Sequence, residues 1–206
     1  STQGVSSAAS DVYKRQVFLS FTPFVSCRKE LFVLEKSKIH KLTLLALMIA
    51  LDVVLSPLMR IEGMAPMSSV MNIIAGVLLG PFYGTVMALV CALIRMTMLG
   101  IPPLALTGAV FGAFFAGLFY RLGGRLIWSM LGEIVGTGII GSLLSYPVMV
   151  WFTGSQNELY WLIYTPRFVG ATLIGSAIAF VVLVKLQETT IFKRWQRLFS
   201  SERMFG

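Results

Sequence analysis

Charged residues are scarce in this 206-residue chain. Only 13% of its residues are Asp, Glu, Lys or Arg, whereas about a quarter are charged in a typical soluble domain. Hydrophobic residues make up 56% of the chain, and its mean hydropathy is +0.81. This composition excludes a soluble globular domain and indicates an all-α integral membrane protein. At about 20 residues per spanning helix, the chain after residue 40 has room for five or six helices in one domain.

Residues that commonly carry chemistry are also few. The single histidine, His40, precedes the first apolar stretch, and Cys27 and Cys91 are far apart. The sequence contains no HExxH, GxSxG or GxxxxGK[ST] motif and no Cys/His cluster. We therefore expect no enzyme activity, no cofactor, no metal site and no ATP hydrolysis by this chain. The remaining enzymatic alternative is a small intramembrane enzyme with Glu133 or Asp52 as acid or base.

The net charge of +8 and the pI near 9.8 do not predict nucleic-acid binding. The Lys and Arg residues cluster at helix ends and at the termini instead of forming one basic face. Such a distribution is typical of the excess of cations in cytoplasmic loops of membrane proteins.

The first apolar stretch is residues 42–55, LTLLALMIALDVVL, which ends before Ser56-Pro57. It carries Ala46 and Ala50 four residues apart, so both lie on one helical face and leave a shallow groove for another helix. We expect this groove to dock a partner protein. Asp52 lies near the other end of the stretch.

Five further apolar stretches predict five more helices. They cover residues 68–79, 82–99, 104–120, 126–152 and 160–186 and are separated by glycine, proline or polar loops. Glycines four residues apart, such as Gly108 and Gly112, predict close packing of helix backbones. Pro147 predicts a kink in the fifth helix. The membrane domain is therefore expected at residues 38–188, followed by a basic amphipathic tail at residues 189–206.

The first 37 residues differ from the rest. The segment SSAASDVYKRQ is polar and without pattern, and it looks like a translated sequencing adapter. Residues 17–25 are too few to span a membrane and are interrupted by Pro23. We expect residues 1–37 to be a non-native or disordered extension, with the natural start near Leu34.

Charge asymmetry predicts the orientation. With six spans both termini lie on one side of the membrane, and that side carries most cations, so we expect cytoplasmic termini. These cations are Lys36, Lys38, Lys41, Arg121, Arg125, Lys185, Lys193, Arg194 and Arg197.

Polar and ionisable residues within apolar helices predict a substrate site, because charges in hydrocarbon are costly and usually functional. By the expected topology such residues gather toward the outer side. Aromatic faces with a few hydrogen-bonding groups suit a small, flat molecule with a polar edge. The expected substrate-binding residues are Asn72, Arg95, Thr107, Tyr146, Trp151, Asn157, Trp161, Tyr164 and Arg167.

Structural roles are alternatives for several of these residues. Asp52 and Arg167 are able to form an ion pair between two helices, and Arg95 to reach the outer headgroups. Asn72 is able to bond an adjacent helix. For Glu133 we expect an interhelical hydrogen bond or a partner contact instead of substrate binding. An interfacial aromatic belt is the alternative for Trp151, Tyr160 and Trp161.

Several segments carry a family resemblance: HKLTLLALMIALDVVLSP, MNIIAGVLLGPFYG, LTGAVFGAFFAGL and GEIVGTGIIGSLLSYPV. Over residues 38–186 the chain resembles the ThiW family of substrate-binding S components of energy-coupling factor (ECF) transporters. The resemblance implies a six-helix subunit in a bacterial or archaeal cell membrane, which binds hydroxyethylthiazole or a close thiamine precursor. It also implies a coupling protein, EcfT, and a pair of ABC ATPases as partners, with Ala46 and Ala50 as an AxxxA docking motif.

Two other transport functions remain as alternatives. A self-sufficient secondary transporter usually shows repeated halves with broken helices at the midplane, and the sequence contains no convincing repeat. An S component for another vitamin precursor has the same overall pattern.

Overall fold

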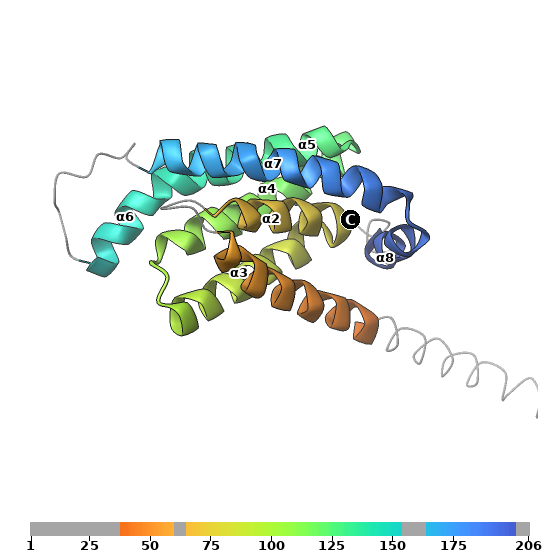
Figure 1. Cartoon of the computed structure of the whole chain (residues 1–206), viewed down its shortest axis with the longest axis horizontal. Coiled ribbons are helices and arrows are strands. Elements are labelled where there is room, and N and C mark those ends of the chain that lie inside the picture. The colour runs from red at the N-terminus through yellow and green to blue at the C-terminus, as the bar shows by residue number, and fades with distance from the viewer. Residues whose placement is uncertain (1–37, 60–64, 154–163, 201–206) are drawn as a thin grey trace, which may run out of the picture. The chain divides into compact units, whose positions relative to one another are not determined.

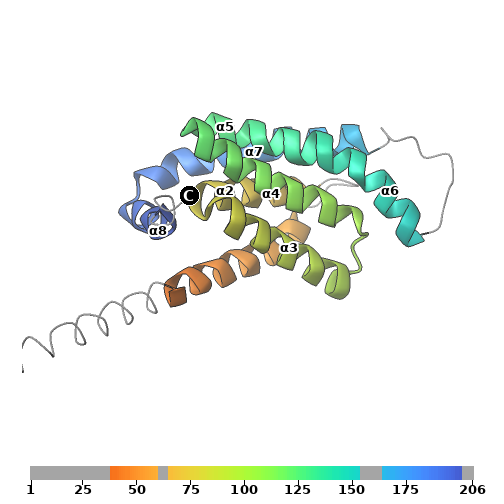
Figure 2. The same ribbon diagram turned by 180° about the vertical axis from the view of Figure 1, so that it is seen from behind.

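The computed structural model describes residues 38–59, 65–153 and 164–200, and every regular element within them is a helix (Figures 1 and 2). This confirms the predicted all-α class. The chain divides into two compact units, Ser1–Leu42 and Thr43–Gly206. The description below concerns the second unit; the expectation for residues 1–37 lies outside the described residues.

Five described helices are long and apolar enough to cross a membrane. They are the first helix Lys38–Leu58, α3 (Gly80–Leu99), α4 (Leu104–Gly123), the continuous helix Leu126–Phe152, and α7 (Thr165–Glu188). The helix α2 (Pro66–Leu78) is apolar but has 13 residues, or about 20 Å at a rise of about 1.5 Å per residue. The hydrocarbon core is about 30 Å thick. The predicted count of six spanning helices is therefore not confirmed.

The predicted helix boundaries agree with the structure within a few residues. The main difference is in the last apolar helix, which was expected from residue 160. Its described part begins at Thr165, with Tyr164 as the residue that precedes the helix, and residues 160–163 lie outside the described part.

The helix α4 packs against α2, α3 and the long helix that follows it. Glycines let the backbones meet: a Cβ atom on Gly76 of α2 would lie 2.7 Å from the backbone nitrogen of Gly117 in α4. A Cβ on Gly136 would lie 3.0 Å from the Cα of Gly112. The predicted backbone packing through glycine is therefore present on two sides of α4.

The long helix has three parts: α5 (Leu126–Glu133), the π-helical segment η1 (Ile134–Gly141) and α6 (Ser142–Thr153), which contains Pro147. Figures 1 and 2 show α6 turning away from the line of α5. A π-helix is wider than an α-helix and is often found at functional sites. The sequence analysis predicted one helix with a proline kink and did not predict the π-helical segment.

The C-terminal helix α8 (Thr190–Ser200) is amphipathic. Its side chains Phe192 and Phe199 are buried in the same apolar cluster as Leu44 and Met48 of the first helix. The cations on α8 are exposed. Together with other exposed cations they form what we call the basic end of the bundle: Arg121, Arg125, Lys185, Lys193, Arg194 and Arg197.

The helix contacts predict a stability difference between two glycine variants. In Gly117→Ala the new Cβ would lie 2.7 Å from the Cα of Pro81, which is backbone and cannot rotate away. We expect a loss of about 1–3 kcal/mol, as for other overpacked sites, seen as a lower melting temperature in detergent. The matched control is Gly84→Ala, whose Cβ would meet nothing closer than 3.7 Å. Equal melting temperatures for the two variants would contradict this packing.

Candidate functional site

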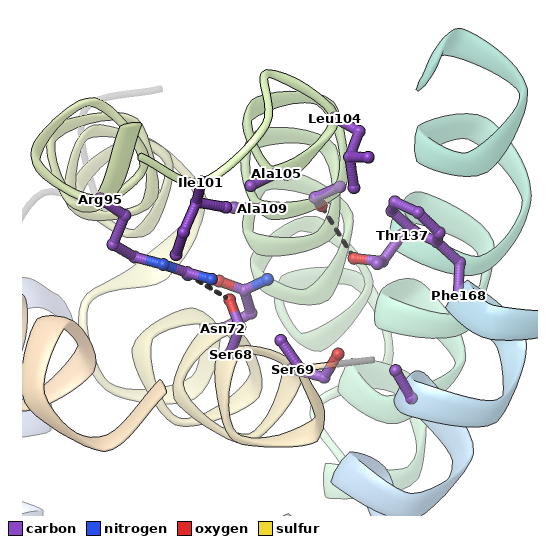
Figure 3. A pocket seen from close by; sticks show the side chains of 13 residues that line it. Ser68, Ser69, Asn72, Arg95, Ile101, Leu104, Ala105, Ala109, Thr137 and Phe168 are labelled. Atoms are coloured by element: carbon purple, nitrogen blue, oxygen red, sulfur yellow. Dashed lines mark hydrogen bonds between the residues drawn. The ribbon is translucent and has the colours of Figure 1, made fainter. Parts of the chain in front are cut away.

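A cavity of about 80 Å³ lies between α2, the end of α3, the start of α4, η1 and the start of α7 (Figure 3). A cavity of about 150 Å³ holds benzene, so this cavity has room for a few waters and must widen to admit a ring. It lies at the end of the bundle opposite to the basic end. Its lining residues are Ala65, Ser68, Ser69, Asn72, Arg95, Ile101, Leu104, Ala105, Gly108, Ala109, Thr137, Phe168 and Ala171.

The helix α2 supplies most of the polar lining. It begins at Pro66, a residue that favours the first position of a helix because it has no N–H to leave unpaired. Ser68 and Asn72 follow with a spacing of four, so they lie on one helical face together with Ser69. All three side chains point toward the cavity in Figure 3.

The end of α3 forms another wall of the cavity. Gly100 has φ of 60°, the left-handed conformation that terminates a helix, and the Ile101 N–H bonds the carbonyl of Arg95 at 3.3 Å. The reversal turns Ile101 inward, where it is buried beside Arg95. Leu104 then begins α4 on the next side of the cavity.

Arg95 is 3% exposed, so it does not reach the headgroups as the alternative interpretation proposed. Its Nη1 donates to Ser68 Oγ at 3.2 Å, and its Nε has no hydrogen-bond partner. Asp52 is fully buried and close enough for its charge to interact with that of Arg95, although neither carboxylate oxygen has a hydrogen-bond partner. Arg167 is exposed, so the alternative ion pair between Asp52 and Arg167 is not formed.

A second polar cluster lies deeper, where Asn72, Glu133 and Thr137 meet. Asn72 Nδ2 donates to Glu133 Oε1 at 3.3 Å, and Thr137 Oγ1 lies 2.8 Å from the same oxygen and 2.9 Å from the carbonyl of Gly108. Glu133 is fully buried, and its bond from Asn72 of α2 is an interhelical hydrogen bond of the kind that the sequence analysis expected. Two further atoms, Asn72 Oδ1 and Glu133 Oε2, are buried without a partner.

The cluster depends on the absence of a side chain at Gly112. A Cβ atom there would collide with Thr137 Oγ1 and lie 2.6 Å from Glu133 Oε2 and 2.9 Å from Asn72 Nδ2. Three polar side chains from three elements thus converge on the bare backbone of α4. This makes Gly112 part of the site, although the sequence analysis read it only as a packing residue.

Two of the nine residues expected in the substrate site, Asn72 and Arg95, line the cavity. Thr107 is buried nearby but bonds Ser145 Oγ at 2.7 Å, which links α4 to α6. Four others are not among the lining residues: Tyr146 and Tyr164 are half-buried, Arg167 is exposed and Trp151 is 82% exposed. Asn157 and Trp161 lie outside the described residues.

The structure adds lining residues that the sequence analysis missed. Ser68, Ser69 and Thr137 are common in apolar helices and follow no motif. Their position could have been inferred from the spacing of Ser68 and Asn72, which places two polar side chains on one face of a short apolar helix. Phe168 contributes the edge of its ring, which lies 2.6 Å from where a Cβ on Gly108 would be.

The side chains that line the cavity are suited to binding a small molecule. Among the described residues no three His, Cys, Asp or Glu side chains lie together as metal ligands. The cavity offers hydrogen-bond donors and acceptors beside an aromatic ring and small apolar side chains. These features suit a small molecule with a polar edge.

The fold and the cavity define the class first: a multi-pass membrane protein that encloses a small polar-lined site between its helices. A comparison with models of protein families then matches residues 42–189 to the family described as thiamine-precursor transporter protein (ThiW). The chain belongs to this family, which confirms the resemblance. It is thus a multi-pass cell-membrane protein of a family that transports thiamine precursors. Comparisons with curated proteins and with solved structures give no match.

The polar cluster predicts unequal effects of two threonine substitutions. Thr137→Val keeps the side-chain shape but removes a hydroxyl within hydrogen-bond distance of Glu133 and of the Gly108 carbonyl. Since Glu133 stays buried with one partner fewer, we expect a loss of about 1–3 kcal/mol and a lower melting temperature. The control Thr172→Val removes an equally buried hydroxyl that bonds only the Val169 carbonyl of its own helix. A larger loss in the control would contradict the role of the cluster.

Proposed function

We propose that this protein is the substrate-binding S component of an ECF-type importer for the thiazole moiety of thiamine, hydroxyethylthiazole or a close precursor. The observation that supports the proposal is the small polar-lined cavity in a member of a thiamine-precursor transporter family. In this proposal the cavity faces outward and the termini are cytoplasmic, since the exposed cations gather at the opposite end.

The size of the cavity favours a single ring over whole thiamine. About 80 Å³ is less than the volume of about 150 Å³ that holds benzene, so a substituted thiazole requires a modest widening of the cavity. Phe168 and the alanines of α4 would contact the apolar ring, while Asn72 and Ser68 would bond its polar substituents. A two-ring ligand would require a much larger displacement of the walls.

The charge of the cavity favours an uncharged ligand. Arg95 is the cation among the lining residues, and the fully buried Asp52 lies close enough for their charges to interact, although the two form no salt bridge. In this proposal the charge of Asp52 offsets part of that of Arg95, which leaves less positive charge for a phosphate group. Arg95 would instead donate a charge-assisted hydrogen bond to an uncharged acceptor through Nε, which has no protein partner.

Substitution of Arg95 tests the position of the ligand. Arg95→Gln removes a charged donor from the cavity, so we expect at least a tenfold weaker binding of hydroxyethylthiazole by calorimetry. The control Arg121→Gln, an exposed arginine at the basic end, should bind within twofold of the wild type. Arg167→Gln distinguishes the cavity from the wider site that the sequence predicts. If it weakens binding as much as Arg95→Gln does, the ligand occupies the wider set of residues predicted from the sequence.

Energy for uptake would come from other chains. The sequence lacks a GxxxxGK[ST] phosphate-binding loop, and the first helix exposes Ala46 and Ala50 while Leu45 and Met48 are buried in the core. Small residues on an exposed face allow close approach of a second helix in a membrane. In this proposal EcfT docks on that face and transmits the work of the paired ABC ATPases.

The docking face predicts a separation of binding from uptake. In Ala46→Trp plus Ala50→Trp, two large side chains fill the exposed face without touching the cavity, so we expect unchanged thiazole binding and loss of uptake in vesicles that contain the whole importer. The control is Leu89→Trp plus Leu93→Trp, with the same spacing on the exposed face of α3. It should retain uptake.

The same assay separates the alternatives. Accumulation of thiazole in vesicles that contain this chain alone, without ATPases, would contradict the proposal and support a self-sufficient secondary transporter. Absence of thiazole binding together with binding of another vitamin precursor would support an S component of different specificity.

A further inference from the structure

A second hollow lies at the basic end, about 520 Å³ in volume. It lies between the turn that joins α4 to α5 and the turn that joins α7 to α8. Its lining residues are Tyr120, Gly124, Arg125, Leu126, Gln187, Phe192, Lys193 and Gln196. We call it the basic groove. It shares no lining residue with the cavity described above.

Two cations line the groove without partners. Arg125 and Lys193 are both exposed, and neither side chain has a hydrogen bond or an ion pair within the described part of the chain. That part contains three carboxylates, of which Asp52 and Glu133 are buried inside the bundle. Among the described residues, Glu188 is then the one carboxylate near the groove in sequence, next to the lining residue Gln187. The groove therefore attracts anions.

Two helices begin at the groove. The helix α5 starts at Leu126, and the residue before it, Arg125, makes no side-chain cap. The helix α8 starts at Thr190, so Lys193 lies in its first turn. The first N–H groups of a helix have no partner within the helix, and the helix dipole places partial positive charge there. Helix starts next to cations are suited to a phosphate group.

The walls of the groove are held in place. Gln196 Nε2 donates to Tyr120 Oη at 2.8 Å and lies 3.4 Å from the Val77 carbonyl, which fixes α8 against α2 and α4. Phe192 is 2% exposed beneath the groove. Gly124, with φ of 66°, has open space in front of it. The hollow is thus a feature of packed helices.

The surroundings of the groove are those of a membrane surface. Trp128 is 46% exposed and its indole packs over Gly123, as is typical of aromatic residues at headgroup depth. Leu122 and Ile127 beside it are 75% and 57% exposed and apolar. The apolar side chains beside the groove are suited to contact acyl chains, and the cations are suited to contact a lipid headgroup at the same level.

We propose that the basic groove binds the phosphate of an anionic phospholipid headgroup, held by Arg125 and Lys193 beside the start of α5. The lipid tails lie along the apolar surface near Leu122 and Ile127. The bound lipid bridges the α4–α5 turn and α8. It thereby fixes the basic end of the bundle at the membrane surface.

The test uses the full chain in an uncharged detergent, with phosphatidylglycerol, phosphatidylcholine or inorganic phosphate added separately. Native mass spectrometry measures retained lipid, and thermal unfolding measures stabilisation. We expect retention of phosphatidylglycerol over phosphatidylcholine. Arg125→Gln plus Lys193→Gln should weaken phosphatidylglycerol binding at least tenfold. The control Lys185→Gln plus Arg194→Gln removes the same charge from exposed residues outside the groove and should change binding less than twofold.

Several results would overturn the proposal. Equal losses in the two double variants would show a diffuse charge effect, and equal retention of both lipids would show no headgroup selection. The same stabilisation by inorganic phosphate alone would show a site for a free anion. If the groove variant unfolds without lipid, Lys193→Gln alone, at an exposed position, provides the same comparison.

Discussion

Backbone contact between α4 and η1 requires glycine on both helices, and the polar interior of the bundle depends on that contact. Gly136 and Gly112 bring the two backbones together, and the missing side chain at Gly112 leaves space for Glu133 and Thr137. In a membrane an unpaired polar group has no water to bond, so such groups remain only where other protein groups reach them. The close approach of α4 therefore permits the cluster, and the cluster forms the deep side of the cavity.

Two ionisable side chains, Arg95 and Asp52, are also buried inside the bundle. Arg95 reaches the cavity because Gly100 ends α3 there, and Asp52 on the first helix faces it from the other side. The first helix thus has two different faces: Asp52 and Met48 are directed into the bundle, whereas Ala46 and Ala50 are exposed. In the proposed importer, the first helix would therefore contact the surroundings of the ligand with one face and the coupling partner with the other.

Much of the fold could be predicted from apolar length and from the Gly and Pro residues between the apolar stretches. The count of spanning helices could not, because α2 is apolar yet only 13 residues long. Nor could η1, since a π-helical segment reflects tertiary contact more than local preference. Asn72 and Arg95 stood out as polar residues in apolar runs, whereas Ser68 and Thr137 did not, because helices tolerate both without a functional reason. Aromatic residues such as Trp151 gave the weakest guidance, since the membrane interface and a ligand site favour the same side chains.

Calorimetry on the purified protein, without any ATPase, tests the central claim most directly. Hydroxyethylthiazole, its phosphate, hydroxymethylpyrimidine and thiamine would be titrated in turn. The account predicts one-to-one binding of the neutral thiazole and at least tenfold weaker binding of thiamine, which is too large for the cavity, and of the phosphate, because the charge of Asp52 offsets part of that of Arg95. Tightest binding of the phosphate or of thiamine would contradict it.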